Sequence, residues 1–257
     1  MFAGWVHEFI PPGIAASEAG VLVVVAFFTS TLSAIVGMAG GITLLAVMLL
    51  FLEPLVAIPL HAVVQVVSNS SRAAVHRRAI EWRILVPFLL PLLPLGWLSL
   101  DLAEQLSPSR ARTIIGAFVL VATWAPGLVL LGRHPEHGEP RRRFFLLGCL
   151  VGVVNVTVGA SGPLIAPFFL NLGISRFALI GTKAACQTGA HLAKIVVFGL
   201  AGFAYAAWAP LLMALSLTVV LGTLFGSRLL GRLNERGFVI LYRSALTLIA
   251  LRLVVAG

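Results

Sequence analysis

The sequence TVGASGP, residues 157–163, interrupts an apolar part of the chain with two glycines and a proline. The segment after it contains Lys183 and Lys194, the only lysines of the chain, in otherwise apolar surroundings. A charge at the centre of a membrane helix costs about 2.5–3.5 kcal/mol on insertion scales. Because residues retained at that cost usually have a function, this stretch is the first candidate for a functional site.

The same pattern occurs once more, 122 residues earlier in the chain. At that constant offset, Gly159, Gly162, Lys183, Gln187, His191 and Lys194 correspond to Gly37, Gly40, His61, Gln65, Asn69 and Arg72. Two glycines, a glutamine and a basic end residue recur without any insertion or deletion. This repetition indicates an internal duplication.

The composition excludes an ordinary soluble domain. Hydrophobic residues make up 60% of the chain and charged residues 11%, and the mean hydropathy is +1.05. The net charge of +9 would suit nucleic-acid binding in a soluble protein, but the arginines lie mostly in short loops between apolar segments, which is typical of membrane orientation. Cys149 and Cys186 lie in apolar segments, so no disulfide framework is expected. Residues 1–20 contain no Lys or Arg that would start a signal peptide, so the whole chain is expected to be mature.

Hydropathy predicts an all-α polytopic membrane protein with ten apolar elements. The first half contains residues 21–36, 42–52, 59–76, 82–100 and 112–131, and the second contains residues 144–158, 164–172, 177–198, 205–225 and 238–255. In each half a glycine break precedes a helix too short to cross a hydrocarbon core about 30 Å thick. The predicted units are a first transmembrane repeat, 1–131, a basic cytoplasmic linker, 132–143, and a second transmembrane repeat, 144–257.

Each half contains five apolar elements. If each half crosses the membrane an odd number of times, the second repeat starts on the opposite side of the membrane and runs opposite to the first. The most basic loops, around residues 77–83, 133–143 and 228–236, would then all be cytoplasmic, and both termini would lie outside. Inverted repeats with broken helices are typical of transporters, because half-helix ends can face an anionic substrate. The predicted fold is therefore two inverted five-element repeats, each with a glycine-broken short helix.

Lys183, Gln187, His191 and Lys194 follow one another at spacings of 4, 4 and 3 residues, and so do His61, Gln65, Asn69 and Arg72. On an α-helix this spacing places each set on one face, as a polar stripe. All nine acidic residues fall at segment ends or in loops, so no buried carboxylate is expected to bind a cation, and amide, histidine and lysine donors suit an anion. We expect Lys183 to supply the main charge and no metal, cofactor or catalytic set. The candidate substrate-binding residues are Gly37, Gly40, Gly41, His61, Gln65, Asn69, Gly159, Ser161, Gly162, Lys183, Gln187 and His191.

Structural interpretations of the same residues stay open. Polar stripes also hold transmembrane helices together, and glycine clusters also allow close helix packing. Arg72 and Lys194 lie toward helix ends, where long basic side chains can reach the membrane interface. Gly222 and Gly226 form a small-xxx-small pair that can pack helices within one chain or in a homo-oligomer.

The glycine motif, the short helix after it and the duplicated architecture resemble the sulfite exporter TauE/SafE family over roughly residues 20–255. The resemblance implies a secondary transporter that exports sulfite or an organosulfonate such as sulfoacetate across the inner (cytoplasmic) membrane. Its expected partners are a small anionic substrate and the lipid bilayer, with no nucleic acid. The halves differ where His61 matches Lys183 and Gly41 matches Pro163, which implies an asymmetric site. The alternatives are an anion channel, an intramembrane enzyme and a scaffold without transport.

Overall fold

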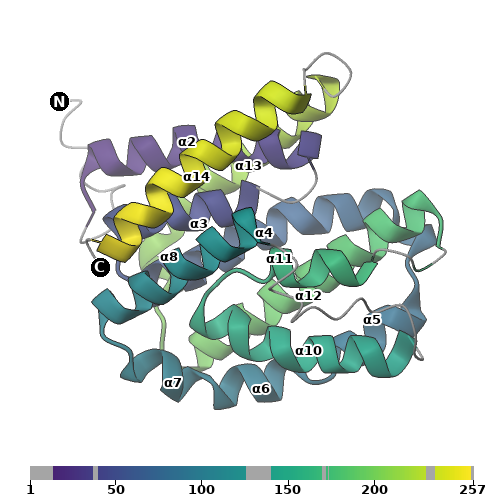
Figure 1. Ribbon diagram of the computed structural model, residues 1–257. Coiled ribbons are helices and arrows are strands. Elements are labelled where there is room, and N and C mark those ends of the chain that lie inside the picture. Colours follow the sequence, from purple (N-terminus) through teal and green to yellow (C-terminus); the bar gives the residue numbers. More distant parts are fainter. Residues whose placement is uncertain are drawn as a thin grey trace.

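The computed structural model describes residues 14–36, 40–125, 140–169, 172, 174–229 and 235–255. Across this part of the chain the secondary structure is helical, without a strand (Figure 1). The prediction of an all-α protein is therefore confirmed. The linker predicted at 132–143 falls mostly outside the described residues.

Helices of the first half follow its predicted apolar elements, with two differences. They are α2 (Ala16–Val36), α3 (Gly40–Phe51), α4 (Pro54–Val75), the 3₁₀ turn η1 (Arg77–Ala79), α5 (Trp82–Leu89), α6 (Leu92–Leu98), α7 (Leu100–Gln105) and α8 (Pro108–Trp124). The element predicted at 82–100 is divided into α5 and α6 because Pro91 caps α6 and has no N–H to continue the helical hydrogen bonds. Helix α7 forms where a loop was expected.

Helices of the second half follow the same order. They are α10 (Pro140–Thr157), α11 (Gly162–Ile165) with the 3₁₀ turn η2 (Ala166–Phe169), α12 (Arg176–Leu200), the 3₁₀ turn η3 (Tyr205–Trp208), α13 (Ala209–Leu229) and α14 (Glu235–Val255). The N-terminus of α12 is fixed by Ser175, whose side chain accepts a hydrogen bond from the Ala178 N–H. The half-length element after the second glycine break is thus α11 followed by η2.

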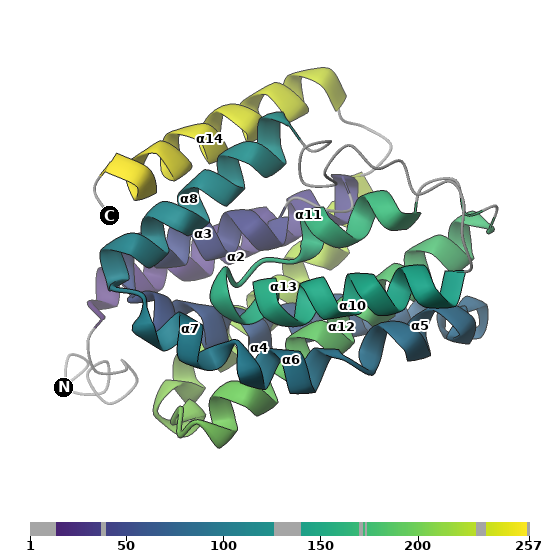
Figure 2. The ribbon, with the colours of Figure 1, turned by 60° about the horizontal axis from the view of Figure 1, so that its bottom comes forward.

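The main helix contacts join the two halves to each other. Helix α2 packs against α13, α10 packs against α5 and α6, α4 packs against α12, and α8 packs against α14. Figures 1 and 2 show α8 beside α14 on one side of the molecule and α10 beside α5 and α6 on another. As a result, α4 and α12, which contain the two polar stripes, lie next to each other.

The glycine pair of α13 is covered by α2 of the same chain. A Cβ atom at Gly222 would collide with Ser30 and with the Phe27 carbonyl, and one at Gly226 would collide with Thr31. Thr31 Oγ1 also donates a hydrogen bond of 3.0 Å to the Gly222 carbonyl. Of the two interpretations of this pair, the structure therefore supports packing within one chain, and a contact between chains would need another surface.

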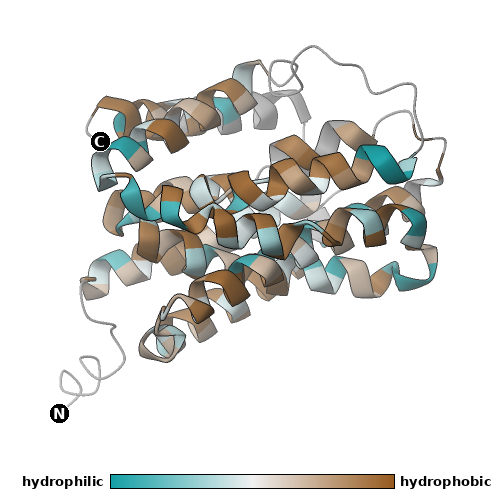
Figure 3. Ribbon diagram, turned by 90° about the horizontal axis from the view of Figure 1, so that it is seen from below, coloured by the Kyte–Doolittle hydropathy of each residue, from teal (hydrophilic) through white to brown (hydrophobic). Residues whose placement is uncertain are grey.

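Hydrophobic side chains face outward on several helices. Phe28, Leu98 and Leu248 are 65%, 71% and 70% exposed, and brown residues predominate along the helices in Figure 3. Exposed apolar surface of this extent is unfavourable in water and natural in lipid. Among the described residues, two helices, Ala16–Ala34 and Tyr205–Gly226, are long and apolar enough to cross a membrane by length and composition alone. The fold is consistent with a membrane protein.

The contact between α13 and α2 leads to a stability prediction. Gly222→Ala should lower the free energy of unfolding by about 1–3 kcal/mol, because the added methyl group overpacks the helix contact. The check is the midpoint of thermal unfolding in detergent.

Gly20→Ala in α2 is the matched control, because a Cβ atom there would meet nothing within 4 Å. Removing a glycine from a helix interior should stabilise the protein by about 0.5–1 kcal/mol. Equal midpoints for the two variants would show that α13 does not approach α2 this closely.

Candidate functional site

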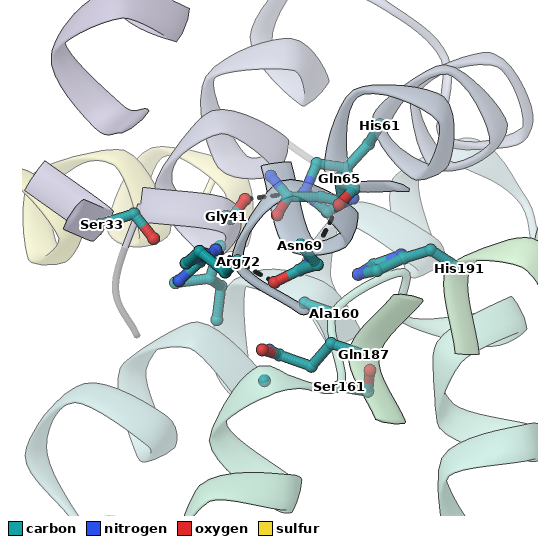
Figure 4. Close-up of a pocket in the computed structure, with 12 residues that line it drawn as sticks. Ser33, Gly41, His61, Gln65, Asn69, Arg72, Ala160, Ser161, Gln187 and His191 are labelled. Atoms are coloured by element: carbon teal, nitrogen blue, oxygen red, sulfur yellow. Dashed lines mark hydrogen bonds between the residues drawn. The ribbon is translucent and has the colours of Figure 1, made fainter. Parts of the chain in front are cut away.

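Helices α4 and α12 and the residues around both glycine breaks enclose one small cavity, shown in Figure 4. Its volume is about 20 Å³, which is room for roughly one water molecule. The lining residues come from segments far apart in the sequence. They are Ser33, Gly41, Ile42, His61, Gln65, Asn69, Arg72, Ala160, Ser161, Gly162, Gln187 and His191.

Most of the candidate residues predicted from the sequence line this cavity. Those that do are Gly41, His61, Gln65, Asn69, Ser161, Gly162, Gln187 and His191. Of the remaining four, Gly37 lies outside the described residues. Gly40 instead faces α2, where a Cβ atom would collide with the Thr29 carbonyl. Gly159 and Lys183 lie near the cavity without lining it.

The cation among the residues that line the cavity is Arg72. The sequence analysis had expected Lys183 to supply the main charge. Arg72 belongs to the α4 stripe, and its Nη2 donates to Asn69 Oδ1 at 3.0 Å and to Ser68 Oγ at 3.3 Å. Both acceptors lie on the same helix, so they hold the guanidinium beside the cavity. Lys183 on α12 is partly exposed and close enough to Arg72 for the two charges to interact.

Lys194 is the second cation that the sequence left open, and it is buried. Its side chain is 1% exposed, and its Nζ donates a hydrogen bond of 2.8 Å to the Gly159 carbonyl. The interpretation of Lys194 as a residue reaching the membrane interface is therefore wrong. Instead, the ammonium group satisfies a backbone acceptor of the second glycine break, which lipid could not do.

Gly159 itself is needed for the shape of this break. Its φ angle is +82°, and a Cβ atom there would lie 2.9 Å from both Ile58 Cγ1 and Leu45 Cδ2. L-residues rarely adopt a positive φ, and the contacts leave no space for a side chain. The break is therefore held against α3 and α4 while Lys194 binds its carbonyl group.

Two histidines from different helices meet at the cavity. The His61 and His191 rings lie 5.6 Å apart between centroids, at an interplanar angle of 80°. They are 2% and 4% exposed, and His61 Nε2 lies 2.8 Å from the Gly41 carbonyl. Within the described part of the chain, Nδ1 of each ring is buried without a hydrogen-bond partner.

Neutral polar groups complete the lining. Ser161 Oγ donates to Asn155 Oδ1 at 3.3 Å, and Asn155 Nδ2 donates to the Ala190 carbonyl at 2.7 Å. This chain of bonds connects the second break to α10 and α12. No Asp or Glu is among the residues that line the cavity, so its charge is positive.

Four lining residues were not in the predicted set: Ser33, Ile42, Arg72 and Ala160. The stripe spacing already pointed to Arg72. Ser33 lies four residues before Gly37, and its place beside the first glycine break is the signal that could have found it. Ile42 and Ala160 have no chemical signal in the sequence, because an apolar side chain at a cavity looks like any core residue.

Comparison with known proteins identifies the family. The family model described as Sulfite exporter TauE/SafE matches residues 22–253. The chain belongs to this family. The match runs from α2 to α14 and includes both glycine breaks, so it confirms the resemblance noted in the sequence. Curated proteins and solved structures give no match. Membership of the TauE/SafE family of transporters agrees with the apolar helical fold, and both describe a membrane protein.

The conformation of Gly159 leads to a second stability prediction. Gly159→Ala should lower the free energy of unfolding through both the positive φ, about 1–2 kcal/mol, and the overpacking against Ile58 and Leu45, about 1–3 kcal/mol more. Thermal unfolding in detergent measures the sum.

Gly202→Ala separates the two effects. Gly202 also has a positive φ, +93°, but a Cβ atom there meets nothing within 4 Å. This variant should therefore show only the backbone contribution. If both variants unfold at the same temperature, the second break is not packed tightly against α3 and α4.

Proposed function

We propose that this TauE/SafE family member is a secondary transporter that exports a small sulfur-containing anion, sulfite or an organosulfonate such as sulfoacetate, across the inner membrane. One observation carries the proposal: the cavity at the two glycine breaks is lined by a guanidinium, amides and hydroxyls, and by no carboxylate among the described residues. Donors of this kind recognise oxyanions.

The charges around the cavity favour an anionic ligand. Arg72 lines it, Lys183 lies near Arg72, and the buried Lys194 lies close enough to His61 and His191 to act on them electrostatically. Buried like charges repel one another, and an anion between them offsets this unfavourable energy. Arg72 adds a planar fork of donors that matches the geometry of an oxyanion.

We further propose that the two halves form an inverted repeat around the cavity. At the offset of 122 residues, α4 corresponds to α12, α8 to α14, α2 to α10, and α5 with α6 to α13. The pairs α4–α12 and α8–α14 thus join equivalent helices, while α2–α13 and the contact of α10 with α5 and α6 are two copies of one packing arrangement. A twofold axis between the halves would produce this pattern. In this proposal both termini lie outside the cell.

The size of the cavity favours a carrier over an open channel. A volume of about 20 Å³ is smaller than an oxyanion with four or more heavy atoms, so substrate entry requires the site to open. In an inverted repeat, one half can move against the other around the fixed site. In a cell with a negative interior, anion export is downhill by about 2.3 kcal/mol per charge per 100 mV, so no coupling ion is required.

Uptake into proteoliposomes under an imposed potential tests this proposal. We expect saturable uptake of labelled sulfite, and we expect Arg72→Gln to raise the half-saturating concentration by about 10- to 100-fold, as loss of a hydrogen bond to a charged group does. Arg72→Lys keeps the charge without the fork and should have an intermediate effect. Arg78→Gln is the matched control, because Arg78 is exposed in η1 and outside the cavity.

Lys183→Ala should have a smaller effect than Arg72→Gln, because Lys183 does not line the cavity. Variants are compared at equal yield of folded protein. Loss of flux in Lys183→Ala with normal flux in Arg72→Gln would move the anion site from the cavity to Lys183. Unsaturable flux would favour a channel, and absence of any sulfur-anion flux would contradict the transport proposal.

A further inference from the structure

The two polar stripes run in opposite directions along the contact between α4 and α12. The ring of His61 lies against the ring of His191. Farther along α4, Arg72 is close to Lys183, which comes before His191 on α12. The paired stripes therefore have two distinct ends. Arg72 and Lys183 lie at the end next to η1, which we call the η1 end, and His61 and Lys194 lie toward the opposite end.

An apolar layer closes the stripes beyond His61 and Lys194. Three residues before His61, the same face of α4 carries Ile58. Three residues after Lys194, the same face of α12 carries Val197. Both side chains are buried in one hydrophobic cluster that also contains Leu45 of α3. These apolar side chains offer a passing anion no polar partner, so this end is closed to it.

At the η1 end the stripes are less buried. Arg72 and Lys183 are partly exposed, whereas His191 on the same stripe as Lys183 is buried. The exposure of Lys183 is not that of a lipid-facing side chain. Leu192, which is exposed on α12, comes nine residues after Lys183, about two and a half turns later, and so points the opposite way. Lys183 is therefore reached from the side of α12 that faces α4.

Basic residues surround the η1 end. The Glu81 N–H donates a hydrogen bond of 2.9 Å to Thr182 Oγ1, next to Lys183, and η1 itself packs against α12. Glu81 is the one acidic residue of the segment 76–83. The exposed basic residues of that segment are Arg77, Arg78 and Arg83.

The other end of α4 has no such excess of positive charge. Glu53, the residue before α4, forms an ion pair of 2.9 Å with Arg112 of α8, so these two charges offset each other. A mouth lined by charges of one sign raises the local concentration of the opposite ion and its rate of association. Electrostatic attraction of an anion therefore favours the η1 end.

We propose that the anion enters the cavity from the η1 end and that Lys183 is an entrance residue, which attracts the anion and passes it to Arg72. This inference rests on the proposed transport function and adds the route to the site. It also explains why Lys183 lies beside the cavity without lining it. With the proposed topology, the η1 end faces the cytoplasm, where an exporter takes up its substrate.

Cysteine labelling tests the route without a transport assay. In a background with Cys149 and Cys186 replaced by alanine, Lys183→Cys is treated in sealed vesicles with a small, membrane-impermeant methanethiosulfonate that carries a sulfonate group. We expect reaction from one side of the membrane, at least about tenfold faster than from the other, because the apolar layer excludes a charged reagent.

Two exposed positions mark the sides in the same background. Arg78→Cys marks the η1 side, and Glu53→Cys marks the opposite side. Lys183→Cys should react from the side that labels Arg78→Cys. Reaction from the side that labels Glu53→Cys, or no reaction from the η1 side, would overturn the proposed route.

Ionic strength tests the role of Lys183 in vesicles whose η1 side faces labelled sulfite. At sulfite concentrations far below half-saturation, Lys183→Gln should slow initial uptake by about tenfold at an ionic strength of about 0.01 M. At about 1 M the loss should be less than about twofold, because the Debye length falls from about 30 Å to about 3 Å. The maximum rate at saturating sulfite should not change.

Two further variants serve as controls for this series. Lys183→Arg keeps the charge and should behave like the unmodified protein. Arg72→Gln should impair uptake at both ionic strengths, because salt screens a charge at a cavity much less than an exposed one.

The outcomes separate this inference from the transport proposal. A loss in Lys183→Gln that is equal at both ionic strengths would make Lys183 a ligand, and no loss at low ionic strength would remove it from the route. Either result overturns the inference and leaves transport standing. Absence of saturable sulfite uptake by the unmodified protein would overturn the transport proposal and, with it, the role of Lys183 as an entrance residue.

Discussion

A helix break in the interior of a membrane protein exposes backbone N–H and C=O groups that lipid cannot satisfy. Here a buried cation, Lys194, binds one of these carbonyl groups. The hydrogen bond from Lys194 to the Gly159 carbonyl closes the second glycine break against α12. The positive φ of Gly159 turns the chain toward Ile58 and Leu45, so the same break also contacts α4 and α3. The next three residues in the chain, Ala160 to Gly162, then line the cavity.

The close contact between α4 and α12 is the second requirement for the site. A polar stripe on a single membrane helix needs a partner that also avoids lipid, and here each stripe is the partner of the other. Around this pair, α2 packs on α13 and α10 packs on α5 and α6. Glycines on α13 and α10 make these contacts close, as Gly222 against Ser30 and Gly148 against Pro91 illustrate. The cavity therefore depends on both halves of the chain.

The balance of charges gives the cavity its chemistry. Arg72, Lys183 and Lys194 place positive charge in and beside a cavity whose lining, among the described residues, includes no Asp or Glu. The histidines add acceptor capacity without adding negative charge, because a neutral imidazole can accept a hydrogen bond through one nitrogen. The proposed oxyanion ligand would accept hydrogen bonds from these donors.

The sequence by itself determined the class of protein, the order of its helices and most of the cavity lining. Composition requires lipid contact, the duplication at a constant offset orders the elements, and a spacing of three or four residues brings Gln65 and Asn69, or Gln187 and His191, onto one helix face. Only the tertiary structure decided which stripe residues reach the cavity. That choice depends on where the partner helix crosses and on which acceptor lies nearest, and neither can be derived from periodicity. For this reason Arg72 lines the site, Lys183 lies beside it, and Lys194 turns to the carbonyl of Gly159.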